Sequence, residues 1–266
     1  MNETTLCHFK NFKVNYTNTI NIKMAFTGVE FSKIAYSSDR DLLHKTLENT
    51  NFNILYINNI EDTNLIIANY ALNSNFLVFS FSGTKDYSYK NIKTNWNLLL
   101  KKTETGRVHS GFTKLFAAFK KIVSPFVKNK NILWTGHSRG GVLAALCQAY
   151  YQRGVTYSFG CPRFANREWV KNNTLPHYRF TFANDPIQYL PPKILSYKHH
   201  GYGIELEENK IFNDLENINN NNFAINDLTY DWHLIKYSVV DWIRGRAPGL
   251  HHYKENYSDY FRKITQ

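Results

Sequence analysis

Residues 136–140 (GHSRG) have the residue types and the spacing of a serine nucleophile held in a sharp turn. A serine hydroxyl attacks a carbonyl carbon when a base removes its proton and nearby N–H groups stabilise the oxyanion that forms. The glycines on either side suit a turn between a strand and a helix, where a Cβ would collide with the neighbouring backbone. The pattern therefore predicts that Ser138 is the nucleophile of an acyl transfer. The alternative is a glycine-rich helix start that Ser138 caps.

A serine nucleophile requires a base, and the base requires a carboxylate that orients it. Among the downstream carboxylates Asp185 has the best position, because it follows the apolar run 178–182 and precedes Pro186. That position is the C-terminal end of a predicted strand, the edge at which sites form in parallel sheets. The other reading of Asp185 is a residue that only initiates the turn before the proline.

Histidines that could act as the base occur in two pairs after Asp185, which fits the chain order Ser, Asp, His of α/β-hydrolases. His199 and His200 lie in a strand-like segment, whereas His251 and His252 follow a loop and precede a short terminal helix. The residue pattern by itself does not decide between the two pairs.

Two backbone N–H groups are needed to stabilise the oxyanion. Arg139, the residue after the nucleophile, supplies one of them. The second is expected from the segment 79–86 (FSFSGTKD), in which Gly83 permits close backbone approach and Thr84 offers an N–H and a hydroxyl. A plain turn over residues 82–84 is the alternative.

The elements that must position these residues alternate between strands and helices. Short apolar runs predict strands over residues 76–81, 131–135, 156–159 and 178–182. Helical spacing of apolar residues predicts helices over residues 115–127 and 141–152. This order is typical of βαβ units, so we expect an α/β fold with a mostly parallel central sheet flanked by helices.

Composition limits the partners and cofactors. The chain has 266 residues, with 32 Lys and Arg against 21 Asp and Glu, and a net charge of +11. The basic residues are dispersed and carry no helix-turn-helix or RNP-like signature, so nucleic acid is not an expected partner. Cys7, Cys147 and Cys161 form no CxxC pair, so we expect buried or free thiols, no disulfide framework and no metal site.

The hydropathy pattern bears on location. No apolar run is long enough to predict a transmembrane helix. The first residues lack the apolar core of a secretory signal, so an intracellular setting is the default expectation.

Several segments resemble, in order, the motifs of the class 3 lipase family. They are residues 79–84 (FSFSGT), 108–112 (VHSGF), 134–141 (WTGHSRGG), 157–163 (YSFGCPR) and 184–192 (NDPIQYLPP). The resemblance implies an α/β-hydrolase fold in which residues 31–266 form a single domain. Residues 1–30 would then be an N-terminal extension or a first helix.

The same resemblance implies which histidine is the base. In this family the base lies near the C-terminus in an H-x-x-x-x-Y segment, and His252 with Tyr257 matches that spacing. His251 ranks second, and His199 matches a structural H-x-G motif that does not supply the base.

The implied site hydrolyses carboxylic esters of lipids, like a triacylglycerol lipase, with no metal or organic cofactor. Its residues would be a triad and two oxyanion N–H donors: Ser138, Asp185 and His252, with Thr84 and Arg139.

Departures from the family pattern bear on the substrate. Arg139 replaces the usual leucine and places a cation near the expected acyl pocket, and Ser82 replaces the usual arginine of the oxyanion segment. The segment that corresponds to the lid, about residues 85–95, is polar and basic. The alternative function is therefore a phospholipase that makes transient contact with anionic membrane surfaces. A non-catalytic lipid-binding relic is the third reading.

Overall fold

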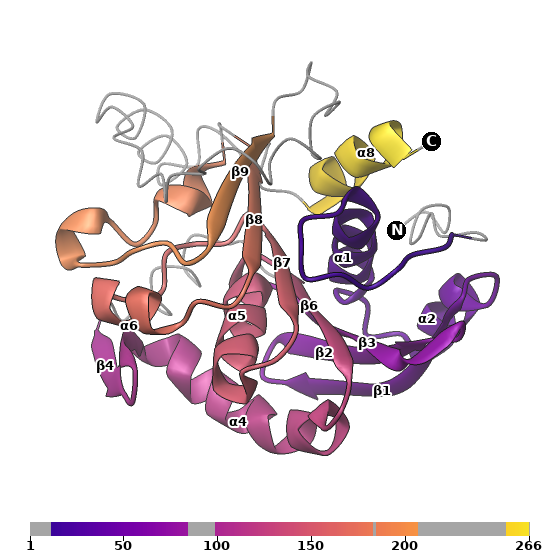
Figure 1. Ribbon diagram of the computed structural model, residues 1–266, viewed down its shortest axis with the longest axis horizontal. Helices are drawn as coiled ribbons and strands as arrows, with labels where there is room; N and C mark the ends of the chain where they lie inside the picture. Colours follow the sequence, from indigo (N-terminus) through magenta and orange to yellow (C-terminus); the bar gives the residue numbers. More distant parts are fainter. Residues whose placement is uncertain (1–11, 85–98, 183–184, 207–253, 266) are drawn as a thin grey trace.

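A seven-stranded sheet forms the centre of the computed structural model, which describes residues 12–84, 99–182, 185–206 and 254–265 (Figure 1). The strand order across the sheet is β1-β2-β3-β6-β7-β8-β9. These strands are β1 (Phe52–Ile60), β2 (Thr63–Tyr70), β3 (Asn73–Phe81), β6 (Asn131–His137), β7 (Val155–Phe159), β8 (His177–Phe182) and β9 (Tyr202–Leu206). A separate hairpin consists of β4 (Leu100–Thr103) and β5 (Gly106–His109).

The sheet is mostly parallel, as the sequence predicted. Strands β3, β6, β7, β8 and β9 pair in parallel, whereas β1 and β2 form an antiparallel meander that leads into β3. The four strands predicted from apolar runs each lie within an observed one, and both predicted helices are confirmed. The strand-like segment of His199 and His200 is a strand only from Tyr202, so both histidines precede β9. The helical elements are α1 (Ile22–Ile34), α2 (Arg40–Leu47), α4 (Ser110–Val127), α5 (Arg139–Tyr151), α6 (Arg167–Asn172), α8 (Lys254–Thr265) and the 3-10 turns η1 (Pro186–Tyr189) and η2 (Lys193–Leu195).

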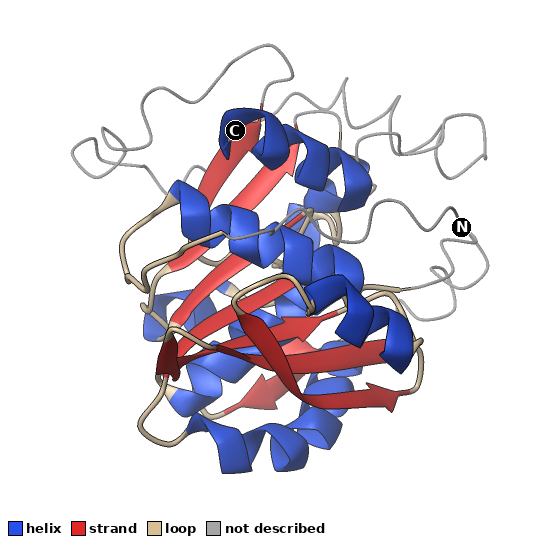
Figure 2. Ribbon diagram, turned by 90° about the vertical axis from the view of Figure 1, so that its right-hand side faces the viewer, coloured by secondary structure: helices blue, strands red, loops and turns tan. Residues whose placement is uncertain are grey.

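Helices cover both faces of the sheet, so the fold has three layers (Figure 2). The side chains of β6 alternate between the two faces, as in any strand. Leu133 packs in the cluster that includes α1, while Ile132 and Trp134 pack in the cluster that includes α4 and α5. Because both faces of β6 are buried, its sequence is an almost continuous apolar run.

Helix α4 begins five residues before the predicted start at residue 115. Its first turn has Phe112 as its one large apolar residue, so hydrophobic spacing did not reveal it. His109 caps the helix, since its Nδ1 accepts a hydrogen bond from the N–H of Gly111 at 3.1 Å. Inside the helix, residues such as Leu115 and Phe119 are buried at the expected helical spacing.

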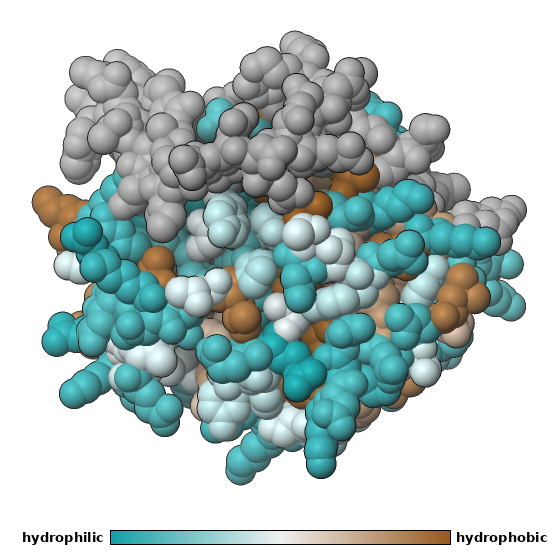
Figure 3. Space-filling model, viewed as in Figure 1, coloured by the Kyte–Doolittle hydropathy of each residue, from teal (hydrophilic) through white to brown (hydrophobic). Residues whose placement is uncertain are grey.

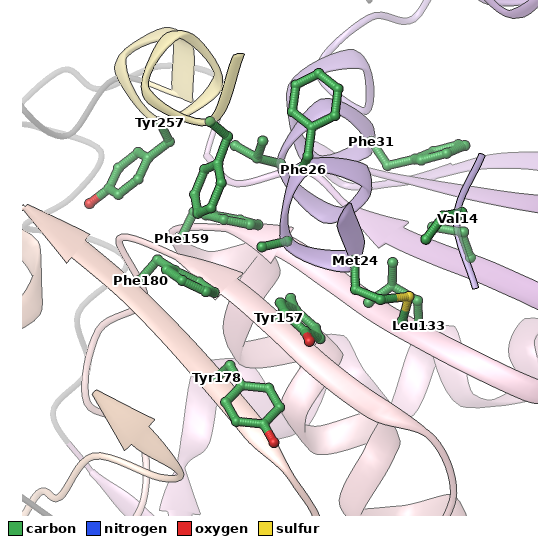
Figure 4. Close-up of a cluster of buried hydrophobic side chains, with 14 of the residues drawn as sticks. Val14, Met24, Phe26, Phe31, Leu133, Tyr157, Phe159, Tyr178, Phe180 and Tyr257 are labelled. Atoms are coloured by element: carbon green, nitrogen blue, oxygen red, sulfur yellow. The ribbon is translucent and has the colours of Figure 1, made fainter. Parts of the chain in front are cut away.

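Helix α1 is an integral part of the core. Val14 and Met24 pack with Leu133 of β6 and Tyr157 of β7 (Figure 4). The expected boundary between residues 30 and 31 therefore falls inside a buried helix.

A buried ionic cluster joins α1 to α8. Lys33 Nζ lies 3.2 Å from Glu30 Oε1, and both side chains are at most 6% exposed. Lys33 also donates to Ser258 Oγ of α8 at 2.9 Å, and Ser258 donates to Glu30 Oε1.

None of the described helices combines the length and the apolar character that a bilayer crossing requires.

Candidate active site

Ser138 occupies a sharp elbow between β6 and α5. Its backbone has φ 55° and ψ −124°, in the positive-φ region that L-residues rarely adopt. Gly136 and Gly140 make the elbow possible, because a Cβ at Gly140 would collide with the carbonyl of Phe81 and one at Gly136 would collide with Gly140 itself. The N–H of Ser138 donates to the carbonyl of Phe159 at 2.8 Å. The predicted strand-turn-helix around the serine is therefore confirmed.

The segment predicted to supply an oxyanion donor lies directly beside this elbow. A Cβ built on Gly83 would lie 3.1 Å from Ser138 Cβ and 2.8 Å from the carbonyl oxygen of His137. Only a glycine allows the backbone of residues 83 and 84 to come this close to the nucleophile. The backbone of Gly83 and the start of α5 at Arg139 therefore adjoin Ser138 from two different segments of the chain.

Asn64 anchors the start of this oxyanion segment. Its N–H donates to Ser82 Oγ at 2.8 Å, and its carbonyl accepts from the N–H of Ser82 at 2.9 Å. Its side-chain amide donates to the carbonyls of Ala35 and Ser37, both at 2.8 Å. Ser82, which stands where the family usually has arginine, is therefore buried and held by β2 and the end of α1.

Tyr36 is a site residue that the sequence did not reveal. Its hydroxyl lies 2.7 Å from Nδ1 of His137, the residue before the nucleophile, and next to the backbone of Gly83. Tyr36 follows α1, far from these partners in sequence, so no local pattern could have indicated the contact.

Asp185 lies three residues beyond β8, as expected, and its side chain is fully buried. Oδ1 accepts a hydrogen bond from the N–H of Ile187 at 2.9 Å, and this bond begins the turn η1. Oδ2 accepts from the hydroxyl of Tyr257 on α8 at 2.7 Å. Burial and the nearby Asp185 carboxylate raise the pKa of Tyr257 well above its ordinary value of 10.0, so this hydroxyl keeps its proton.

Of the two histidine pairs, only His199 and His200 lie among the described residues. His251 and His252 lie outside the described residues, although His252 precedes the start of α8 by two positions. His200 uses both ring nitrogens within the core. Its Nε2 lies 2.8 Å from the carbonyl of Asn173, and its Nδ1 lies 3.0 Å from Nδ1 of His177.

This histidine pair extends to a buried serine that is not the predicted nucleophile. His177 Nε2 lies 2.7 Å from Ser158 Oγ. Because a carbonyl can only accept, His200 donates from Nε2, His177 donates from Nδ1, and Ser158 donates to His177. Burial lowers the pKa of His200 to about 4 and that of His177 well below its ordinary value. Both rings are therefore neutral, structural core residues.

His199 is likewise buried and held neutral, because burial lowers its pKa well below its ordinary value. Its Nδ1 has no hydrogen-bond partner among the described residues.

The guanidinium of Arg139 points to the turn between β1 and β2. Its Nη2 lies 2.5 Å from Asp62 Oδ1 and 2.5 Å from Thr63 Oγ1. The charge expected near the acyl pocket is therefore paired with the carboxylate of Asp62. The expected lid, residues 85–95, lies outside the described residues.

Two of the three cysteines lie among the described residues, and Cys7 lies outside them. Cys147 and Cys161 are buried, and burial raises the pKa of the Cys161 thiol to about 12. Across the described residues, no three His, Cys, Asp or Glu side chains are grouped so that they could hold a metal ion.

Comparisons with known proteins connect this geometry to a family. Residues 78–195 match the family model of lipase (class 3). Secreted mono- and diacylglycerol lipase 1 of Fusarium solani is 33% identical over 106 residues, which are 35% of this chain and 32% of that protein. The match thus spans about a third of the length of that curated relative.

Solved structures show the fold. The lipase of Rhizopus microsporus var. chinensis has a TM-score of 0.60 and 21% identity, covering 74% of this chain and 80% of that one. Lipase II of Rhizopus niveus has a TM-score of 0.57 and 19% identity, covering 68% and 79%. The chain therefore has the α/β-hydrolase fold of these fungal lipases.

Proposed function

We propose that the protein is a serine hydrolase of lipid carboxylic esters, since residues 78–195 match the class 3 lipase family model. The observation that carries the proposal is the positive-φ elbow of Ser138, with Gly83 packed against its Cβ. This arrangement places Ser138 between the backbone of residues 83–84 and the start of α5, as acyl transfer with two backbone N–H donors requires. Relatives named as lipases support an ester of a lipid as the substrate.

The proposed mechanism is that of a serine triad. His252 removes the proton of Ser138 as Oγ attacks the ester carbonyl, and Asp185 orients the imidazole and stabilises its charged form. The N–H groups of Thr84 and Arg139 stabilise the oxyanion. The alcohol then leaves with a proton from His252. Water, activated by the same base, hydrolyses the acyl-enzyme and restores Ser138.

The contact between Tyr257 and Asp185 supports His252 as the base. Tyr257 brings the start of α8 to the carboxylate at 2.7 Å. His252 is five residues earlier in the chain, and five residues span at most about 18 Å. This chain length allows His252 to reach Asp185, whereas His200 is engaged with His177.

Labelling with a fluorophosphonate probe tests the proposal, because the probe reacts with activated serines. We expect one label on the wild-type protein, located at Ser138, and none on Ser138→Ala. A panel of p-nitrophenyl esters, triacylglycerols and phospholipids then defines the substrate. A wild-type protein that neither labels nor hydrolyses any ester would favour the non-catalytic lipid-binding relic.

The net charge favours a second candidate within the same chemistry. A protein of charge +11 is attracted to anionic membranes, so phospholipids of such membranes are the alternative substrate. This attraction is electrostatic, and salt therefore weakens it. Hydrolysis of vesicles that is independent of both salt and anionic lipid would remove this candidate.

A further inference from the structure

A basic hairpin stands at the edge of the molecule. Lys102 of β4 pairs directly with Arg107 of β5, and both side chains are exposed beside the exposed Lys101. Like charges at directly opposed positions destabilise a hairpin. This pair is therefore most favourable when an external anion lies over it.

Helix α6 adds two more cations to the same side. The hairpin and the helix are joined by reciprocal bonds, because Arg107 N–H donates to Asn166 Oδ1 and Asn166 N–H donates to the carbonyl of Arg107, both at 2.9 Å. Arg167 and Lys171 are exposed and lie four residues apart, on one face of the helix. Figure 1 shows β4 and α6 together at the left of the molecule.

A groove continues this surface from α6 to η2. It has a volume of about 680 Å³, and its cations are Arg167, Lys171, Lys193 and Lys198. The N–H of Lys198 donates to the carbonyl of Ala165 at 2.7 Å, so the chain after η2 is fixed beside the start of α6. Residues 99–109, 166–173 and 193–198 together carry seven Lys and Arg against two Glu. We call these three segments the basic flank.

Aliphatic side chains protrude from the basic flank. Ile194 is 78% exposed, Leu99 is 64% exposed and Leu195 is 41% exposed. In Figure 3 hydrophobic side chains project among hydrophilic ones at the left edge, over the orange turns of Figure 1. Exposed aliphatic residues surrounded by Lys and Arg are typical of surfaces that enter the boundary between lipid headgroups and acyl chains.

We propose that the basic flank docks on a bilayer that contains anionic phospholipids. The cations bind the phosphate groups of the headgroups, and Ile194 and Leu195 enter the boundary beneath them. A nucleic acid would offer the phosphates but nothing apolar for these side chains, so the membrane is the partner that the surface favours. The inference rests on the proposed function, because docking on a bilayer would place a lipid hydrolase on its substrate.

The test is vesicle co-sedimentation in a Ser138→Ala background, so that no lipid is consumed. The vesicles are phosphatidylcholine with and without phosphatidylglycerol. Arg167→Glu/Lys171→Glu is compared with Lys121→Glu/Lys128→Glu, which removes the same charge from exposed positions of α4 and its end. Ile194→Ser is compared with Leu72→Ser, an exposed leucine (60%) at the turn between β2 and β3.

We expect Arg167→Glu/Lys171→Glu to weaken binding to the anionic vesicles by about 30-fold. Ile194→Ser should weaken it by about 5-fold. Both control variants should remain within about 2-fold of the parent, and raising the salt from 0.1 to 1 M, which shortens the Debye length from about 10 to 3 Å, should release the protein. Circular dichroism of each variant checks that it is folded.

Equal losses in the flank and α4 variants would overturn the proposal, because only net charge would then matter. Binding that ignores phosphatidylglycerol, or that prefers DNA to the vesicles, would overturn it as well. Hydrolysis of p-nitrophenyl butyrate by the wild-type protein needs no membrane. A failure of the proposed function would appear in that assay and not in the sedimentation, so the two failures are distinguishable.

Discussion

The hydroxyl of Tyr257 donates a hydrogen bond to Oδ2 of Asp185 at 2.7 Å, and both groups are buried. This bond joins the C-terminal helix α8 to the loop that follows β8. The ring of Tyr257 also packs against Phe159 of β7, with ring centroids 6.0 Å apart (Figure 4). It lies closer to Phe182 of β8, at 4.8 Å between centroids. One residue therefore supports the proposed carboxylate and fixes the helix that follows the proposed base.

Tyr257→Phe removes this donor and keeps the packing of the ring. A hydrogen bond to a charged group contributes about 1.5–3 kcal/mol, so we expect kcat/KM for p-nitrophenyl butyrate to fall by about 10-fold or more. Thermal unfolding should show a smaller change than in Tyr257→Ala, which also loses the aromatic contacts. Unchanged kinetics in a Tyr257→Phe protein of normal stability would show that the bond does not orient Asp185.

The ionic cluster of Glu30, Lys33 and Ser258 should be the second attachment of α8. Lys33→Met leaves the Glu30 carboxylate buried without its cation, which typically costs about 3–5 kcal/mol of unfolding free energy. The double variant Glu30→Gln/Lys33→Met removes both charges and should be less destabilised than Lys33→Met alone. Urea unfolding measures both values, and a double variant that is the less stable of the two would refute this account.

The ion pair between Arg139 and Asp62 should stabilise the nucleophile elbow modestly. The guanidinium is 13% exposed and the carboxylate is 42% exposed, so solvent screens part of the attraction. A double-mutant cycle with Arg139→Leu and Asp62→Ala should give a coupling energy of about 1 kcal/mol. Urea unfolding of the wild type, the two single variants and the double variant measures this coupling energy. If the two single losses of unfolding free energy simply add in the double variant, the ion pair contributes nothing.

The buried histidines should make the fold sensitive to acid. His177 and His200 stay neutral in the folded protein, because burial lowers the pKa of His200 to about 4 and that of His177 well below its ordinary value. In the unfolded chain each binds a proton near pH 6.5. The unfolded state therefore holds more protons between about pH 6.5 and 4, and the free energy of unfolding falls as the pH falls.

Each of the two histidines should contribute up to about 1.4 kcal/mol per pH unit in that range. Urea unfolding between pH 7 and pH 4.5 measures the slope, and His200→Gln should make it shallower. A wild-type stability that does not change over this range would contradict the neutral state of the pair.

The features predicted from the sequence are those that local chemistry determines. The elbow at Ser138, the close approach of Gly83 and the position of Asp185 each depend on glycine, on proline or on the end of an apolar run. The parallel sheet followed from the alternation of such runs with helical spacing. Strand β1 escaped prediction because it is rich in asparagine and only partly buried.

The contacts that the sequence did not predict join residues far apart in the chain. Tyr36 meets His137 across 101 positions, and Arg139 meets Asp62 across 77. A side-chain bond between distant elements leaves no periodic pattern in either of them. The charge of Arg139 was visible in the sequence, but its direction depended on the turn between β1 and β2.

The central claim is that Ser138 is the nucleophile, and its most direct test is the hydrolysis of p-nitrophenyl butyrate by Ser138→Ala. The loss of a triad nucleophile removes nearly all chemistry that depends on the triad. We predict that kcat falls by about 10⁴-fold or more, with an unchanged circular dichroism spectrum. A folded Ser138→Ala protein that keeps kcat within about 10-fold of the wild type would contradict the account.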